Sequence, residues 1–428
     1  MFSIEKLCPK EASGSAQNCE RLAIGRRGGN GWMTSRRSPP PPFGACGRPF
    51  KRPFSVLAIA LVAFSLVACA SRPESGFLSA VAHAPQGATD HTLLVATTRE
   101  RDARPGTLFN GDRASAIDYA ELTVSVPPNH KQNEIEWATT PPGDPNVNFV
   151  VRDEKYLDGD KAFLQALNAQ LALRPPGSRN VFLFVHGFNT MFAEAVYRGV
   201  QLAHDSQAPG VPVLFTWASR GQATAYVYDL NSATAARDAL EHTLRLLLRS
   251  NAEKVNVLAH SMGNWVTVEA FRQIRISGDL PPANKIGTIL LAAPDIDIDV
   301  FKSQLRRFGK PQKPFYVVLS QDDRALFLSR TIAGGVTRVG DASDTAELTA
   351  LGASVIDLSD VKATDATNHD KFVQLASVAP QLSGILAQGI NANHRGTDAS
   401  ERAASGVGSI VALPLTLLGA PVKIIAGQ

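Results

Sequence analysis

A serine directly after an apolar run is the feature of this sequence with the clearest chemical potential. Residues 254–266 read KVNVLAHSMGNWV, and Ser261 has a small residue two positions before it, Ala259, and two positions after it, Gly263. A serine that exposes its hydroxyl at a strand end needs a sharp, strained turn, which leaves room only for small neighbours. The spacing therefore predicts a nucleophile at Ser261, with alanine in place of the more usual first glycine.

Such a nucleophile needs a base, and only two histidines follow it in the sequence. His369 lies in DATNHDKF, between the last predicted strand of a parallel series and the final predicted helix, where a loop can carry a base over a sheet. His394 lies in a polar segment near the end and is the weaker alternative. We expect His260, which precedes Ser261, to be a neighbour of the site and not its base.

The acid that orients the base has three candidates. Asp322 and Asp323 follow the apolar run PFYVVLS, and Asp295 follows the run before it, in LLAAPDIDID. The spacing from Asp323 to the next apolar residues, Ala325 and Leu326, favours Asp323, and the other two remain open. An aspartate pair in this position is also typical of a solvated turn or a helix cap.

The oxyanion formed by attack of the serine needs donors that are already in place. The run FLFVHGFN ends in Gly187, which allows close approach of the backbone, and the amides of Phe188 and Met262 are the predicted donors. We expect His186 to pack this loop. A reaction of this kind requires no metal and no cofactor.

The elements that must position these residues alternate along the chain. From about residue 154, apolar runs rich in β-formers alternate with stretches of helical spacing, while residues 91–153 hold several short β-like runs, including NEIEWATTPPG. The pattern predicts an α/β fold: a mostly parallel central sheet with helices on both faces, preceded by a short β-rich section. In such a sheet, sites form at the carboxyl ends of the strands, where each candidate above lies.

Several stretches together resemble the DUF900 family of bacterial α/β-hydrolases, over roughly residues 91–385: FVHGFNTMFAEAVYRGVQLAHD, VPVLFTWASRGQATAYVYDL, VLAHSMGNWV, LAAPDID and LSQDDRAL. The resemblance implies an α/β-hydrolase fold with an esterase-like triad. On this sequence that triad is Ser261, Asp323 and His369. It implies little about the substrate.

The first 68 residues have the character of a leader segment. They hold ten Lys and Arg against three Glu, whereas the rest of the chain is slightly acidic. A basic pair precedes a 15-residue apolar run, residues 54–68, and the end of this run together with Cys69 reads LVAC, which resembles a lipobox. Acylation of Cys69 would give stable membrane anchoring, and Ala70 after it is typical of lipoproteins of the outer membrane. This charge distribution argues against a nucleic-acid partner.

The predicted boundaries follow from these features. Residues 1–68 are the leader, of which 1–32 stay untranslated if Met33 is the start; 69–90 are a tether; 91–390 are the hydrolase domain; and 391–428 are a polar linker and an apolar tail. The tail is expected to touch membrane or a partner, to pack back on the domain, or to be disordered. Cysteines 8, 19 and 46 precede the cleavage point, so the mature chain has no disulfide and no cysteine metal site.

The predicted function is that of a serine hydrolase of small-molecule or lipid carboxylic esters, acting on the periplasmic face of the cell envelope. Two alternatives remain at this point. An acyltransferase would use the same acyl-enzyme but resolve it with an alcohol or amine. A catalytically inactive envelope scaffold would keep the fold alone, since a fold does not determine a function.

Overall fold

The fold was analysed in a computed structural model of the chain. It describes residues 72–207, 210–278, 284–309, 315–343, 345–378, 410–417 and 420–425. Cys69, His394 and the leader lie outside these ranges, so the predictions made for them stay predictions. Within the described ranges, no helix is both long and apolar enough to cross a bilayer.

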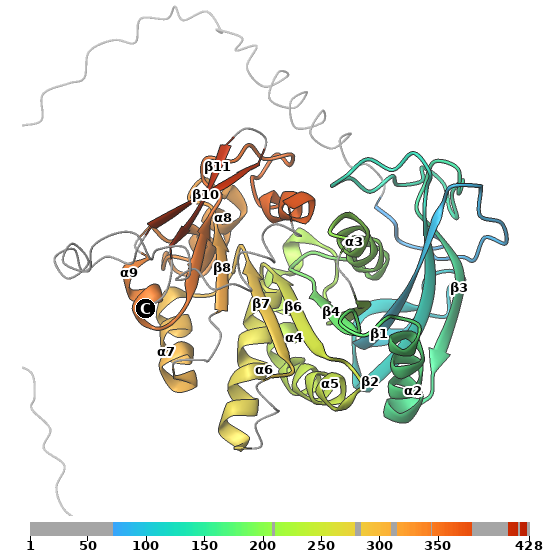
Figure 1. Ribbon diagram of the computed structural model, residues 1–428, viewed down its shortest axis with the longest axis horizontal. Coiled ribbons are helices and arrows are strands. Elements are labelled where there is room, and N and C mark those ends of the chain that lie inside the picture. Colours follow the sequence, from blue (N-terminus) through green and yellow to red (C-terminus); the bar gives the residue numbers. More distant parts are fainter. Residues whose placement is uncertain are drawn as a thin grey trace, which may run out of the picture. The chain divides into compact units, whose positions relative to one another are not determined.

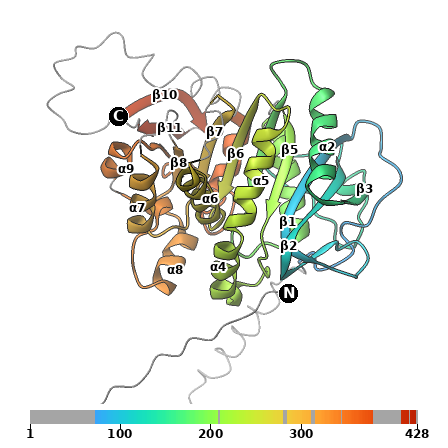
Figure 2. The same ribbon diagram turned by 90° about the horizontal axis from the view of Figure 1, so that it is seen from below.

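One eleven-stranded sheet runs through the domain, in the order β10-β11-β9-β8-β7-β6-β4-β5-β1-β2-β3. Figure 2 shows this order across the molecule. The strands are β1 (Thr89–Arg101), β2 (Phe109–Val126), β3 (Val150–Leu157), β4 (Asn180–Val185), β5 (Val211–Thr216), β6 (Lys254–His260), β7 (Ile286–Ala292), β8 (Phe315–Leu319), β9 (Ser354–Asp357), β10 (Ile410–Leu417) and β11 (Ala420–Ile425). Within the sheet, the neighbouring strands β9-β8-β7-β6-β4-β5-β1 pair in parallel. Antiparallel strands flank them on both sides, β11 next to β9 and β2 and β3 next to β1.

Helices cover both faces of the sheet, as predicted (Figure 1). They are α2 (Gly159–Ala172), α3 (Phe192–Asp205), α4 (Tyr226–Ala235), α5 (Arg237–Arg249), α6 (Gly263–Ser277), α7 (Ile298–Phe308), α8 (Arg324–Ile332) and α9 (Ala346–Ala350), with short 3₁₀ turns η1 (Ala223–Ala225), η2 (Val339–Asp341) and η3 (Lys371–Val378). Apolar side chains of α2, α4, α5, α6 and α7 pack on one face. Those of α3 and η3 pack on the other.

The β-rich section at the start of the domain differs from its prediction in two places. The run NEIEWATTPPG, residues 133–143, forms no strand and belongs to the loop between β2 and β3. The predicted tether also begins to pack much earlier than residue 91, because Phe77 and Leu78 are buried in the same core as α3. The composition of this segment, rich in Ala, Pro and Ser, gave no indication that Phe77 and Leu78 would be buried.

The apolar tail packs back on the domain, which was one of its predicted alternatives. β11 pairs with β9, and β10 pairs with β11, so the two strands extend the sheet at one edge. Leu417, Val422 and Ile424 are buried there. The tail thereby covers the edge that β9 would otherwise present.

Candidate active site

Ser261 occupies a strained turn between β6 and α6. Its φ is +52°, a left-handed conformation that costs free energy for any residue with a Cβ atom. The turn is held from behind: the Ser261 amide donates to Ala292 O at 2.9 Å, and the Asn264 side chain donates to Ser261 O at 2.9 Å and to Ala292 O at 2.8 Å. These bonds join the turn to the end of the neighbouring strand β7.

The two small neighbours of Ser261 have different roles. A Cβ atom on Gly263 would lie 2.3 Å from the carbonyl oxygen of His186, so only glycine fits there. Ala259 is an ordinary buried strand residue, paired with Val185 on one side and Leu291 on the other. The strand-to-helix turn at Ser261, called the elbow below, is therefore tightest at Gly263, whereas position 259 accepts the methyl group of alanine.

Substitution of Gly263 by alanine is expected to destabilise the fold by about 3 kcal/mol or more, because the new methyl group meets a backbone carbonyl that cannot rotate away. Urea unfolding followed by circular dichroism measures the effect. Gly199→Ala in α3 is the matched control, since a Cβ atom there lies an ordinary 3.6 Å from Phe184. Equal stability of the two variants would contradict the proposed packing of the elbow.

The structure brings Asp323 and His369 together. Nδ1 of His369 lies 2.7 Å from Oδ2 of Asp323, whose side chain is almost fully buried. The other carboxylate oxygen of Asp323 accepts from the Leu326 amide at 2.9 Å and so caps the start of α8. Asp323 thus combines both sequence interpretations, because it is a helix cap and the partner of His369.

The other two acid candidates are held by different groups. Asp295 accepts from Ser329 at 2.5 Å and from Tyr226 at 3.1 Å, and it pairs with Arg338 at 3.2 Å. Asp322 pairs instead with the buried ammonium of Lys371 at 2.6 Å. Neither shows a hydrogen bond to His369 among the described residues.

The surroundings of His369 favour its charged form. Burial by itself would lower the pKa of His369, but the hydrogen bond and negative charge of Asp323, with further charge from Asp370 and Asp295, outweigh burial and raise it. The ring of His260 lies against that of His369, with centroids 4.7 Å apart, and stacks on Phe372. Burial holds the pKa of His260 well below its usual value, so this ring is a neutral packing partner, as predicted.

A cavity of about 300 Å³ adjoins His369, and Gly187, Phe188 and Asn189 at the end of β4 also line it. Ser261 lies beside these residues, because a Cβ atom on Gly187 would be 2.7 Å from Ser261 Cβ. In the described part of the chain, no hydrogen bond joins the Ser261 hydroxyl to His369. Such contacts are often loose before a substrate binds.

The predicted oxyanion donors come from two elements that meet at this point. Phe188 follows β4, and Met262 follows Ser261 at the entrance to α6. Among the described residues, neither of these two backbone amides has a hydrogen-bond acceptor. His186 has the packing role expected of it, stacked on Trp217 and bonded to Thr216 Oγ1 at 2.8 Å.

Sequence reasoning missed one residue at the rim of the cavity, Arg72. Its guanidinium donates to the side chain of Asn189 at 2.7 Å, to Gly221 O at 2.6 Å and to the carboxylate of Glu194. A lone arginine in a Pro and Ser-rich stretch carries no signal of this contact, since its partners lie more than a hundred residues further along the chain.

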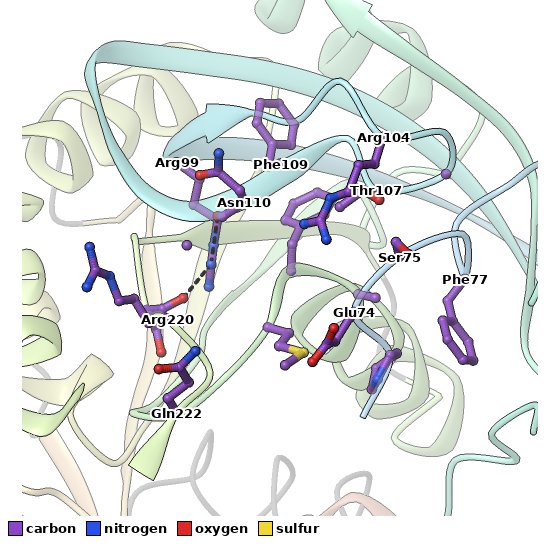
Figure 3. A pocket seen from close by; sticks show the side chains of 17 residues that line it. Glu74, Ser75, Phe77, Arg99, Arg104, Thr107, Phe109, Asn110, Arg220 and Gln222 are labelled. Carbon is purple, nitrogen blue, oxygen red and sulfur yellow. Dashed lines mark hydrogen bonds between the residues drawn. The ribbon is translucent and has the colours of Figure 1, made fainter. Parts of the chain in front are cut away.

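A second cavity, of about 250 Å³, is lined by both polar and apolar side chains, among them Arg99, Arg104 and Phe109 (Figure 3). Its fully buried arginine, Arg99, donates to backbone oxygens of Thr190 and Ser219 at 2.8 and 2.7 Å. Burial lowers the pKa of Arg99 to about 10. No residue of the predicted triad lines this cavity, and Arg99 supports the loop that carries Phe188.

Comparison with known proteins assigns this chain to a family. The family model described as "Alpha/beta hydrolase of unknown function (DUF900)" matches residues 161–385. A similar solved chain comes from a structural analysis of two fungal esterases from Rhizomucor miehei, with 12% identity, a TM-score of 0.30, and coverage of 80% of this chain and 98% of the fungal one. No curated protein matches the chain. The chain belongs to the DUF900 family of α/β-hydrolases.

Proposed function

We propose that this protein is a serine hydrolase that cleaves carboxylic esters through Ser261, His369 and Asp323. The observation that carries the proposal is the 2.7 Å contact between His369 and Asp323, at a site where Ser261 is held at positive φ. A buried carboxylate on Nδ1 directs the other imidazole nitrogen outward as a base. A strained elbow exposes the hydroxyl that this base would deprotonate.

The proposed reaction has two halves. His369 takes the proton of the Ser261 hydroxyl as the oxygen attacks the ester carbonyl, and the amides of Phe188 and Met262 bind the resulting oxyanion. Collapse breaks the bond to the alcohol, which leaves with the proton from His369. Water then attacks the acyl-enzyme with His369 as base again, which releases the acid and restores Ser261.

The rim of the site favours lipid esters as the substrate class. Arg72 is bound at this rim, and it is three positions after Cys69, so covalent geometry limits their Cα atoms to about 11 Å apart. If Cys69 carries lipid, as the sequence predicts, the cavity beside His369 opens close to the outer-membrane surface. So short a link between the lipid anchor and the site would hold the site close to the ester bonds of membrane lipids.

Exposed apolar side chains next to the site support the same substrate class. On α4, Val227 is 65% exposed, and on α8 both Phe327 and Leu328 are 59% exposed. A 2.8 Å hydrogen bond between the hydroxyls of Tyr226 and Ser329 joins the two helices. The ring of Tyr226, the neighbour of Val227 in α4, packs edge-on against the ring of Phe188, whose amide is a proposed oxyanion donor.

Labelling with a fluorophosphonate probe, followed by assay of an acyl-chain series, tests the proposal. We expect wild-type protein to be labelled at Ser261 and to hydrolyse long-chain esters presented in vesicles faster than short soluble ones. An unlabelled wild-type protein would overturn the nucleophile. Labelling with a preference for short soluble esters would retain the hydrolase and overturn the lipid substrate class. A product ester formed on addition of an acceptor alcohol would identify a transferase.

A further inference from the structure

A second cluster of ionisable side chains lies outside the proposed active site. His130 comes from the β2–β3 loop, and His204 and Asp205 end helix α3. Each of the three residues offers one possible ligand atom, and these three atoms lie within 4.8 Å of one another. Nε2 of His130 is 2.8 Å from Oδ1 of Asp205, and both side chains are more than nine-tenths buried.

The groups around this cluster hold its members in fixed orientations. Glu136 binds the remaining nitrogen of His130, Nδ1, at 2.8 Å. The second oxygen of Asp205 accepts from the Asn133 amide at 2.7 Å and from the Gln201 side chain at 2.5 Å, which leaves Oδ1 to face His130. An outer carboxylate on an imidazole is the arrangement that orients metal-bound histidines in many zinc proteins.

A third imidazole belongs to the same cluster. Nε2 of His91, in β1, lies 2.9 Å from Nδ1 of His204, and the two rings meet edge-on. The His130 ring also meets the His204 ring edge-on, with centroids 5.2 Å apart. Three histidines from three distant parts of the chain therefore converge at the C-terminal end of α3, where the helix dipole favours a cation.

We propose that His130, His204 and Asp205 bind a zinc ion, with Glu136 and His91 holding the two ligand imidazoles in place. Two nitrogens and a carboxylate oxygen are a donor set that zinc accepts, and three protein ligands leave one position for water. Ligand atoms of one tetrahedral zinc ion are about 3.4 Å apart, so the 2.8 Å contact between His130 and Asp205 must lengthen and the wider separations, of up to 4.8 Å, must shorten, by side-chain movements of about 1 Å. Imidazole binds zinc in its neutral form, so zinc affinity is expected to increase with pH.

This site would act on the cavity beside His369 through the loop that it fixes. Ile135 and Trp137, on either side of Glu136, line that cavity. Trp137 also packs on Tyr197 of α3, with centroids 5.2 Å apart. A zinc ion between His130 in this loop and the end of α3 would tie one wall of the cavity to the helix that supports it. This role in fixing the loop is separate from the ester chemistry.

Calorimetric titration of zinc into chelator-treated, dialysed protein tests the site without any assay of activity. We expect one zinc ion per chain, an increase in Tm on zinc addition, and binding at least 100-fold weaker in His204→Gln and Asp205→Asn. Glu136→Gln is expected to bind about 10- to 100-fold more weakly, as is typical when the orienting partner of a ligand is lost. Cobalt in place of zinc provides a second readout in wild-type protein, through the visible bands of a four-coordinate site.

Two control variants locate the ion. His242→Ala removes an exposed histidine that pairs with Asp160 elsewhere and is expected to bind zinc normally. His369→Gln removes the proposed base and is also expected to retain zinc. Absence of zinc binding in wild-type protein, equal binding by the His204 and Asp205 variants, or loss of binding only in His369→Gln would each overturn the proposal. The last outcome would place the ion at the triad, whereas the first two leave the proposed ester hydrolysis untouched.

Discussion

Replacement of Ser261 by alanine is expected to lower kcat/KM for carboxylic esters by about 10⁴- to 10⁶-fold and to abolish fluorophosphonate labelling. The variant keeps the base, the acid and the oxyanion donors but has no atom that can form the acyl-enzyme. Folding is expected to change little, because the described residues provide no hydrogen-bond partner for this hydroxyl and alanine occupies the same strained turn. Steady-state assays with the wild type's best ester measure the loss.

Ser277→Ala is the matched control for this variant. Ser277 ends helix α6, the helix that begins just after Ser261, and its hydroxyl donates to Ile274 O at 2.9 Å and accepts from Arg245 at 2.7 Å at the exposed end of the helix. It is expected to retain wild-type activity. Ester hydrolysis by Ser261→Ala at more than one-hundredth of the wild-type rate, with circular dichroism showing a native fold, would refute Ser261 as the nucleophile.

Replacement of Asp323 by asparagine is expected to reduce kcat by about 10⁴-fold while leaving stability nearly unchanged. Asparagine caps a helix as well as aspartate does, so the bond to the Leu326 amide that starts α8 survives. The charge beside His369 is lost, and with it the group that fixes the tautomer and stabilises the imidazolium. Urea unfolding and kinetics on the same preparation separate the two effects.

The pH profile gives this variant a second readout. Because His369 must be neutral to accept a proton, wild-type kcat/KM is expected to increase with pH through a pKa above the usual value near 6.5. In Asp323→Asn the effect of burial prevails, and that midpoint is expected to move to lower pH. Asp322→Asn, which removes the partner of Lys371, is the control and is expected to keep the wild-type midpoint. An unshifted profile in Asp323→Asn would argue against Asp323 as the partner of the base.

The sequence alone was sufficient for the fold class, and it predicted positions for the reacting groups. Apolar strands such as 254–260 alternate with amphipathic helices, and that periodicity reports burial on each face of an element. The turn at Ser261 could be predicted because a strained turn allows only small residues at the neighbouring positions. Both signals are local, since they depend on neighbours within a few positions.

Only the tertiary structure shows how the partners of Asp295, Asp322 and Asp323 differ. All three follow strands at the same edge of the sheet, so spacing favours Asp323 without excluding the other two, whereas their partners, Arg338, Lys371 and His369, distinguish them.

The contact of Arg72 with the site rim and the convergence of His91, His130 and His204 were likewise decided by tertiary structure. These contacts join residues that lie tens of positions or more apart in the chain. They depend on how the loops close over the sheet, which no local pattern of residues encodes.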